Sequence, residues 1–365
     1  MATCLVWGCH TTEASEPPAF ALVQIDAQNV TPIGRNGFRP DVVTIQDTLY
    51  LAYNDAAARG FRLIRLREDL TTVEPVVDLY SARAPIDFPT DIRVAAGAPN
   101  TFWSAFETVV PDATSTACDE RWVNAAIYDA AGAEPSLSAS AVDLITGCPP
   151  PNAGASRALI YNNPVADDPT PFYHQGSYYV MARSAMGPML HFHSYDAALQ
   201  ETENFIVDLE PTIGDQNISQ NTLISIEGQV YLIAGVASGP PVIPTSTSQL
   251  LAIPLAADLR SVAGAVVELL TDPTQYNTRS TSAIYDDGRL YTNGLDSWAD
   301  AGDGTTTTAG YLHVFDVAGG FSVLERIEIE RGSSVDSHSS LAIIGGKVYV
   351  FYQGEGQQLL VKVFE

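Results

Sequence analysis

Short apolar runs recur along this chain, and each is followed by a tight turn and a second run in which apolar and polar residues alternate. Six of these units share a motif: a turn residue, a variable residue, an apolar residue and an aromatic residue. The motif occurs at residues 47–50, 100–103, 176–179, 228–231, 288–291 and 346–349. Alternation with a period of two is typical of half-buried strands, and Gly or Asp at the turn supplies the positive φ that tight hairpins need.

The units extend beyond the hairpin to four strands each. In the fifth unit the apolar runs fall at residues 282–285, 290–294, 311–317 and 321–329, with the first turn at 286–288. Repeated four-stranded units are typical of a β-propeller, in which each unit forms one blade. We therefore predict an all-β, six-bladed β-propeller. Seven blades would require another blade within the long second repeat, and five would require one repeat to be misassigned.

The sixth unit lacks its last strand. Its first three strands fall at residues 340–344, 348–352 and 359–364, and the sequence ends at Glu365. Residues 20–26 form an apolar run ahead of the first unit and have no partners there. We predict that this segment closes the last blade, because closure removes two free sheet edges. The expected organisation is a leader or lipoprotein tether at 1–18 and a single propeller domain at 19–365.

The charge of the chain narrows its partners. Its 365 residues carry a formal net charge of −25. Such an acidic surface repels phosphate backbones, so we expect no nucleic-acid partner. No run of about 18 apolar residues occurs, which predicts no membrane-spanning helix. We expect a monomer.

The amino terminus offers one route to a membrane. Residues 5–9 (LVWGC) resemble a bacterial lipobox, which implies lipidation of Cys9 and anchorage through that lipid. The alternative is a disordered leader in which Cys4 and Cys9 are incidental.

Two further cysteines flank a predicted hairpin. Cys118 and Cys148 lie on either side of strand-like runs at 122–128 and 137–145, which are joined by a turn at 129–135. The two thiols would face each other across this hairpin, where disulfide geometry is attainable. We predict a disulfide and hence an extracytoplasmic location, namely periplasm, cell surface or medium. The alternative is a pair of reduced thiols.

Alignment of the units on their first turn predicts a column of small polar residues along the innermost strands. Its members are Asp41, Thr90, Thr170, Thr222, Ser282 and Ser340. Hydroxyl groups in a crowded channel can bond neighbouring backbone, so we interpret this column as structural.

A second, more varied column stands two residues earlier, at one mouth of the channel. It comprises Arg39, Phe88, Asp168, Gln220, Ser280 and His338, and Asp87, Tyr276 and Arg279 lie close by in the sequence. We predict that Arg39, Asp87, Gln220, Tyr276 and Arg279 bind a polar small molecule or glycan, because such groups make directional hydrogen bonds. The alternative is a hydrated channel mouth without a ligand.

Two local motifs resemble carbohydrate-active propellers. Phe38-Arg39-Pro40 looks like the entry to the first blade of sialidases, which implies that Arg39 and Arg279 contact a substrate carboxylate; the Asp-boxes of sialidases are missing. Asp167-Asp168-Pro169 is similar to the Asp-Pro motif of arabinanase-like hydrolases. That resemblance implies Asp41 and Asp168 as two catalytic carboxylates, but no glutamate matches the third.

Metal and cofactor chemistry has little support in the sequence. His191 and His193 alternate on one strand and face the same way; with no third ligand in view, we interpret them as ordinary strand histidines. Asp296, Asp300 and Asp303 miss the spacing of a calcium loop. We expect no cofactor and no metal, with calcium at these aspartates as the alternative.

The function predicted from the sequence is that of an extracytoplasmic binding module for a glycan or another polar ligand. A first alternative is a propeller glycoside hydrolase or polysaccharide lyase that uses Asp41, Asp168 and His338. A second is a protein-interaction scaffold. Binding is preferred because the sequence supplies a polar ring but no complete catalytic set.

Overall fold

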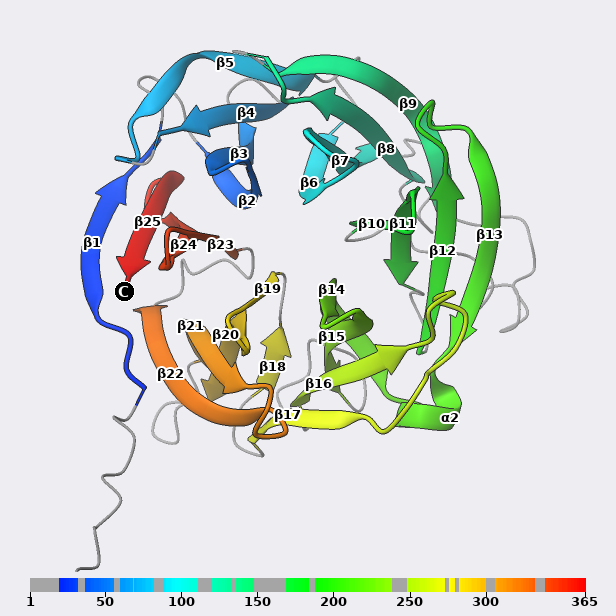
Figure 1. The fold of residues 1–365 in the computed structure, drawn as a ribbon, viewed down its shortest axis with the longest axis vertical. Helices are drawn as coiled ribbons and strands as arrows, with labels where there is room; N and C mark the ends of the chain where they lie inside the picture. The colour runs from blue at the N-terminus through cyan, green and yellow to red at the C-terminus, as the bar shows by residue number, and fades with distance from the viewer. Residues whose placement is uncertain are drawn as a thin grey trace, which may run out of the picture.

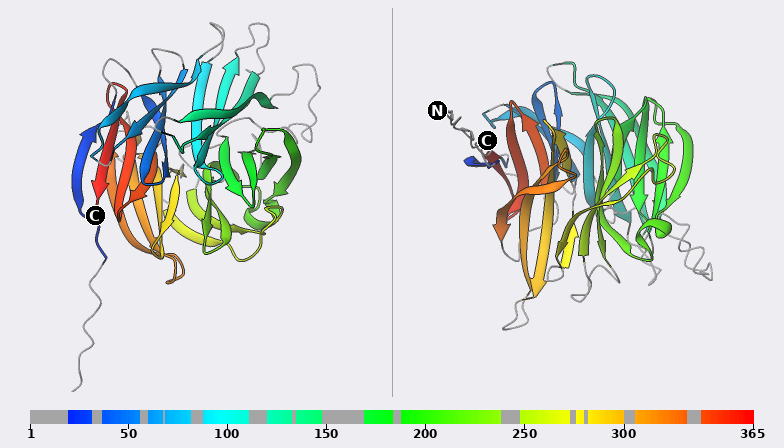
Figure 2. Two further views of the ribbon diagram at one scale, coloured as in Figure 1. Left: turned by 45° about the horizontal axis from the view of Figure 1, so that its top comes forward. Right: turned by 60° about the horizontal axis from the view of Figure 1, so that its bottom comes forward.

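Six antiparallel sheets surround a central channel in the computed structural model of this protein (Figure 1). The structure describes residues 20–31, 37–55, 60–67, 69–81, 88–110, 120–132, 135–147, 169–183, 188–237, 248–272, 276–279, 282–299, 306–331 and 339–365. The sheets lie side by side around a ring, and their strands run between its two faces (Figure 2). The predicted six-bladed propeller is confirmed, and the alternatives of five and seven blades are wrong.

The first three blades follow the chain, each running from the channel outward. Blade 1 contains β2 (Phe38–Ile45), β3 (Thr48–Asp55), β4 (Gly60–Leu66) and β5 (Thr72–Ser81). Blade 2 contains β6 (Phe88–Ala96), β7 (Thr101–Val110), β8 (Glu120–Asp129) and β9 (Ser136–Gly147). Blade 3 contains β10 (Thr170–His174), β11 (Ser177–Arg183), β12 (Met189–Tyr195) and β13 (Glu201–Asp208).

The last three blades complete the ring. After the short helix α2 (Glu210–Ile213), blade 4 contains β14 (Asn217–Ile226), β15 (Gln229–Ala237), β16 (Ser248–Leu255) and β17 (Val267–Asp272). In blade 5 the innermost strand is split into β18 (Tyr276–Arg279) and β19 (Ala283–Asp286), followed by β20 (Arg289–Ala299), β21 (Thr306–Asp316) and β22 (Ser322–Arg331). Blade 6 contains β23 (Ser339–Ile344), β24 (Lys347–Gly354), β25 (Gln358–Phe364) and β1 (Gln24–Asn29).

The two ends of the chain share blade 6, as predicted. Strand β1 pairs antiparallel with β25, with Gln24 opposite Phe364 and Asn29 opposite Leu360. Just ahead of β1, the backbone of Val23 exchanges two hydrogen bonds of 3.0 Å with Glu365. The first strand therefore takes the outermost place that the last repeat leaves open.

The repeated motif is explained by the interfaces between blades. Its apolar member is almost fully buried in every blade, at Leu49, Phe102, Tyr178, Val230, Leu290 and Val348. Successive strand residues point to opposite faces of a sheet, so the apolar residue and the aromatic residue pack against different neighbouring blades. In blade 1, Leu49 packs with side chains of blade 6, whereas Tyr50 packs with side chains of blade 2. One dipeptide thus fills two interfaces.

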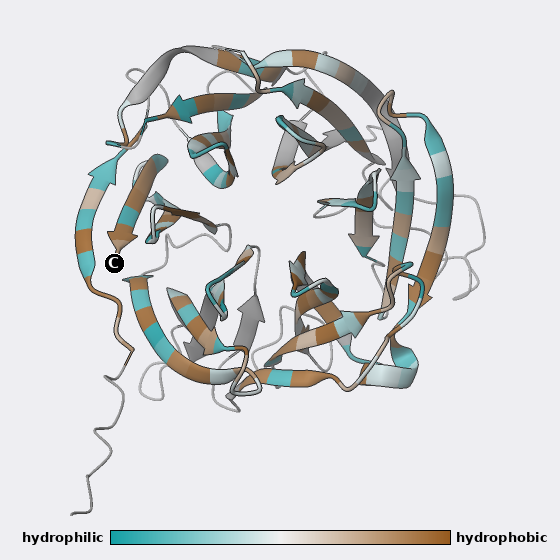
Figure 3. Ribbon diagram, in the orientation of Figure 1, coloured by the Kyte–Doolittle hydropathy of each residue, from teal (hydrophilic) through white to brown (hydrophobic). Residues whose placement is uncertain are grey.

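The outermost strands have a different character. Along β22, hydrophilic and hydrophobic residues alternate, whereas β13 begins with hydrophilic residues and continues with hydrophobic ones (Figure 3). Most side chains of both strands are exposed or half-buried. Among the described residues, no helix is long and apolar enough to cross a membrane.

Candidate functional site

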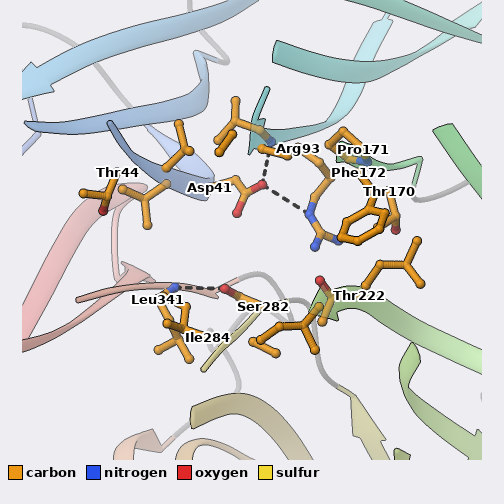
Figure 4. Close-up of a pocket in the computed structure, with 18 of the residues that line it drawn as sticks. Asp41, Thr44, Arg93, Thr170, Pro171, Phe172, Thr222, Ser282, Ile284 and Leu341 are labelled. Carbon is orange, nitrogen blue, oxygen red and sulfur yellow. Dashed lines mark hydrogen bonds and ion pairs between the residues drawn. The ribbon is translucent and has the colours of Figure 1, made fainter. Parts of the chain in front are cut away.

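The central channel contains a cavity of about 390 Å³. Its wall comes from the innermost strands of all six blades, β2, β6, β10, β14, β19 and β23, together with Ser282 just ahead of β19 (Figure 4). In blades 1 to 4 each strand contributes four consecutive residues, beginning with Asp41, Arg93, Thr170 and Thr222. The cavity is thus a property of the whole ring.

These four residues share one level of the channel with Ser282 and Ser340, and we call this level the inner ring. It comprises Asp41, Arg93, Thr170, Thr222, Ser282 and Ser340. Each lies across the ladder from the residue two places after the motif aromatic, such as Ala52 opposite Asp41, Met181 opposite Thr170 and Phe351 opposite Ser340.

The sequence alignment was correct for five members of this ring and wrong for Thr90. In blade 2, Arg93 pairs with Ala105, whereas Thr90 lies at a β-bulge between Pro89 and Asp91. The first turn of this blade is one residue longer than in the others, so its ring residue stands ten positions before the motif aromatic rather than nine. Counting back from Trp103 with that allowance would have identified Arg93; the search for a hydroxyl group pointed to Thr90 instead.

The ring residues connect neighbouring blades by hydrogen bonds. An innermost strand is a sheet edge, and the backbone N–H groups on its open side need acceptors. Ser282 Oγ accepts from Leu341 N at 3.1 Å, and Ser340 Oγ accepts from Val42 N at 3.0 Å. Asp41 Oδ2 accepts from Val94 N at 2.7 Å. The structural interpretation of the column is confirmed at these three interfaces.

Asp41 has two further partners inside the ring. Arg93 Nε lies 3.3 Å from its Oδ2 atom, and Ser340 Oγ donates to its Oδ1 atom at 2.6 Å. Asp41 and Arg93 are each only 6% exposed. Three donors from blades 2 and 6 therefore hold this carboxylate, and its charge is balanced by the guanidinium beside it.

Beyond the ring the wall becomes apolar and then opens. The next level that shares the ring's side of the strands contains Val43, Ala95, Phe172, Ile224 and Ile284. One step further, near the turns that join first and second strands, stand Thr44, Ala96, Tyr173 and Ser225. In the close-up, the Arg93 side chain extends from blade 2 toward Phe172 of the neighbouring blade 3 (Figure 4).

Four of the five ligand-binding residues predicted from the sequence are described, and their backbone lies on the other side of the ring. Arg39 sits in a bulge between Phe38 and Asp41, with φ of 51° and a half-buried side chain. Gln220 falls in a similar bulge of β14, and Tyr276 and Arg279 are the ends of β18. Asp87, Asp168 and His338 lie outside the described residues, so of the three proposed catalytic residues only Asp41 is placed.

Two histidines are buried outside the channel. His191 is 5% exposed, and burial, followed by the nearby His193, lowers its pKa to about 4. Its strand neighbour His193 contacts Glu201, with 2.9 Å between Nδ1 and Oε1. His313, in β21, is fully buried, and burial lowers its pKa to about 3.

Metal and disulfide predictions fall largely on parts of the chain that are not described. Within the described ranges, no group of three or more His, Cys, Asp or Glu side chains is arranged to hold a metal ion. Asp300 and Asp303 of the calcium alternative lie outside those ranges, as do Cys118, Cys148, Cys4 and Cys9. The hairpin predicted between Cys118 and Cys148 is present as β8 and β9, which pair antiparallel.

Comparison with known proteins gives relatives in fold but not in sequence. No protein-family model matches the chain, and no curated protein sequence matches it. Among solved structures, an α-L-arabinanase of Penicillium chrysogenum complexed with arabinobiose is 13% identical, with a TM-score of 0.51, and the match covers 95% of this chain and 98% of that one. An exo-β-1,3-galactanase of Phanerochaete chrysosporium with β-1,3-galactotriose is 11% identical, with a TM-score of 0.51 and coverages of 92% and 79%. A Trypanosoma rangeli sialidase in complex with sialic acid is 10% identical, with a TM-score of 0.47 and coverages of 95% and 59%.

This protein is therefore a β-propeller of the architecture found in carbohydrate-active enzymes. The resemblance seen in the sequence is confirmed at the level of the scaffold. A shared fold does not carry a shared reaction, because chemistry resides in particular side chains placed on the fold.

Proposed function

We propose that this protein is an extracytoplasmic propeller that binds a polar ligand, specifically a glycan, in its central channel. The observation that carries the proposal is the cavity itself. Its volume of about 390 Å³ falls in the range of ligand pockets, roughly 300–1,000 Å³. It combines apolar walls with a few convergent polar groups at the inner ring, which is the usual composition of a small-molecule site.

The charge of the cavity favours a neutral ligand. Asp41 and Arg93 form an ion pair, and the other polar side chains among the described residues of its wall carry hydroxyl groups. Hydroxyl groups both donate and accept hydrogen bonds, as do the hydroxyls of a sugar. A neutral saccharide would match this lining better than an anion, whose approach the net charge of −25 also opposes.

Glycoside hydrolysis is the second candidate, and the scaffold comparisons support it. It generally requires two carboxyl groups placed about 5–10 Å apart across the scissile bond. Among the described residues that line the cavity, Asp41 is the one carboxylate, and its oxygen atoms accept from three donors. A general base or nucleophile needs an oxygen atom that faces the substrate, so this arrangement favours binding over catalysis.

Calorimetric titration with arabinobiose, β-1,3-galactotriose and sialic acid tests the proposal. We expect saturable binding of at least one neutral sugar, no binding of sialic acid, and no release of reducing sugar on long incubation. Thr222→Val, which removes one ring hydroxyl, should weaken that binding. Release of reducing sugar would establish the hydrolase alternative, whereas absence of binding to all three sugars would favour the protein-interaction scaffold.

The location outside the cytoplasm is part of the proposal and is tested through the cysteines. Trypsin should place Cys118 in the peptide 94–121 and Cys148 in the peptide 122–157. We expect these two peptides to be joined in protein purified from its native compartment and separated after reduction. Free thiols at both positions would contradict the disulfide and remove this support for an oxidising location.

A further inference from the structure

Among the described residues, the two ends of the cavity wall differ in exposure. All six inner-ring residues are 9% exposed or less. At the opposite end of the lining, Ala96 and Ser225 are exposed, and Thr44 and Tyr173 are half-buried. Exposure therefore rises along each strand from the ring toward the turns that join first and second strands, and we call that side of the disc the hairpin face.

The described residues on the far side of the ring do not contribute to the wall. Pro40, Asn221 and Ser339 each stand one residue before a ring member, and none of them lines the cavity. Among the described residues, the buried ion pair and hydroxyl groups are thus the deepest part of the wall, and we call them the floor of the chamber. The residues predicted as a ligand site, such as Arg39 and Gln220, belong to the opposite mouth.

The chemistry of the chamber changes with depth. The floor offers the Asp41–Arg93 pair and the hydroxyls of Thr170, Thr222 and Ser282. Above it, Phe172, Ile224 and Ile284 present apolar surface, and the rim is small and polar at Ser225. A ligand would thus meet hydrogen-bonding groups at its leading end and apolar surface along its sides, which matches the hydroxyls and the C–H faces of a sugar ring.

We propose that the ligand enters through the hairpin face and binds end-on, with the terminal sugar of a neutral glycan resting on the Asp41–Arg93 floor. This inference rests on the proposed function for the identity of the ligand, but the direction of entry can be tested without any sugar. It predicts that the two mouths of the channel are not equivalent, and that only the hairpin mouth gives access to the inner ring.

Access is measured by thiol labelling of Thr222→Cys. The tryptic peptide 184–260 contains position 222 and none of the four native cysteines, so mass spectrometry reports the introduced thiol separately. Two tryptophan substitutions are made on the same strand. Ser225→Trp adds bulk three residues beyond Thr222, at a position that lines the cavity near the hairpin face. Gln220→Trp adds the same bulk two residues before Thr222, on the other side of the ring. Ser136→Trp on the outermost strand β9 controls for the added bulk, because Ser136 is exposed and far from the channel in the sheet order.

We expect Ser225→Trp to slow labelling by a methanethiosulfonate reagent at least tenfold, and Gln220→Trp and Ser136→Trp to change the rate less than twofold. Ala96→Trp provides a second narrowing of the hairpin mouth from blade 2 and should act in the same direction. Slower labelling with Gln220→Trp alone would overturn the proposal and place the entrance at the opposite mouth. Circular dichroism and the urea midpoint of each variant verify that it is folded.

The same substitutions in the native background, combined with the sugar titration, test the binding mode. End-on entry predicts that Ser225→Trp weakens the binding of the neutral sugar at least tenfold, whereas Gln220→Trp leaves it within twofold. If labelling shows the hairpin mouth open but no sugar binds, the function is wrong and the direction of access stands. If sugar binds and only Gln220→Trp weakens it, the function stands and the end-on inference fails.

Discussion

Asp41 both links neighbouring blades and lines the central cavity. Its carboxylate accepts from the backbone of blade 2, from Arg93 and from the hydroxyl of Ser340 in blade 6. Hydrogen bonds to a buried charge are stronger than those between neutral groups, and a buried charge that loses its partner is costly. Asp41 therefore joins three blades and at the same time sets the charge of the cavity floor.

The substitution Asp41→Ala should lower the free energy of unfolding by about 3–5 kcal/mol, because it removes the counter-charge of a buried guanidinium and the acceptor of Val94 N–H. Ser282→Ala is the matched control: it removes the acceptor of Leu341 N–H without changing any charge, and should cost about 1–3 kcal/mol. Urea denaturation measures both. Equal costs for the two variants would show that the ion pair adds nothing to the backbone contacts.

His313 makes stability depend on pH. Burial lowers its pKa in the folded state to about 3, with the charge of Arg326 acting in the same direction. Below the ordinary pKa of 6.5, His313 binds a proton in the unfolded chain, whereas in the folded protein it stays neutral until the pH is near 3. This contribution to stability is complete above pH 6.5 and is lost progressively as the pH falls toward 3.

His313→Phe should remove that dependence. Among the described residues neither ring nitrogen of His313 has a hydrogen-bond partner, and its flanking side chains include Tyr311 and Phe315, so a phenyl ring suits the site. Between pH 6 and pH 4 the variant should gain stability relative to the natural protein by roughly 1 kcal/mol per pH unit. Urea unfolding at several pH values measures the difference, and parallel pH profiles would contradict the assignment.

At the scale of elements, strand β1 contributes to stability mainly by closing the last blade. Its own side chains are mostly exposed, so it contributes little apolar burial. It stabilises the ring by covering the open edge of β25. The segment just ahead of it is held to blade 5 by Leu22 N, which donates to Glu325 Oε2 at 2.7 Å. The same segment contacts blade 5 a second time, because the guanidinium of Arg289 lies 4.5 Å from the centre of the Phe20 ring.

A chain that begins at residue 32 should therefore lose stability and associate with itself, because β25 then presents unpaired N–H and C=O groups. A chain that begins at residue 20 keeps the strand and serves as the control, with a melting temperature within about 2 °C of the full chain. Adding a synthetic peptide of residues 20–31 to the shorter chain should restore the melting temperature. Light scattering reports the association; a stable monomer without β1 would contradict the role assigned to closure.

At the scale of the whole molecule, net charge opposes compactness. A formal charge of −25 on 365 residues generates repulsion that salt screens over a Debye length of about 10 Å at 0.1 M. We expect the melting temperature at pH 8 to rise as sodium chloride increases from about 0.02 M to about 0.5 M. The same increase in salt should have a smaller effect at pH 5, closer to the isoelectric point of about 4.3. A larger effect at pH 5 would show that screening of net charge is not the cause.

The sequence was sufficient for the architecture because the strand period and the turn chemistry are local. Residues such as Leu49 and Tyr50 reveal their two opposite faces by adjacency alone, and the missing strand of the sixth repeat indicated the role of the amino-terminal segment. The channel was predicted less fully. Arg93 was missed because Thr90, a hydroxyl residue like most other members, was assigned to the ring; that assignment requires a longer first turn in blade 2 than the single extra residue that the structure shows.

By itself, the sequence determined a closed ring of six sheets and five of the six side chains at its inner ring, since both follow from a pattern that repeats along the chain. Only the tertiary structure decided that Arg93 stands beside Asp41, that this pair is buried in the wall of a central cavity, and that the described wall becomes more exposed toward the hairpin turns. Those features arise between blades, where residues separated by about fifty positions or by nearly the whole chain come into contact, as Asp41 does with Val94 and Ser340. Burial and the pairing of charges depend on that assembly and cannot be read from any single repeat.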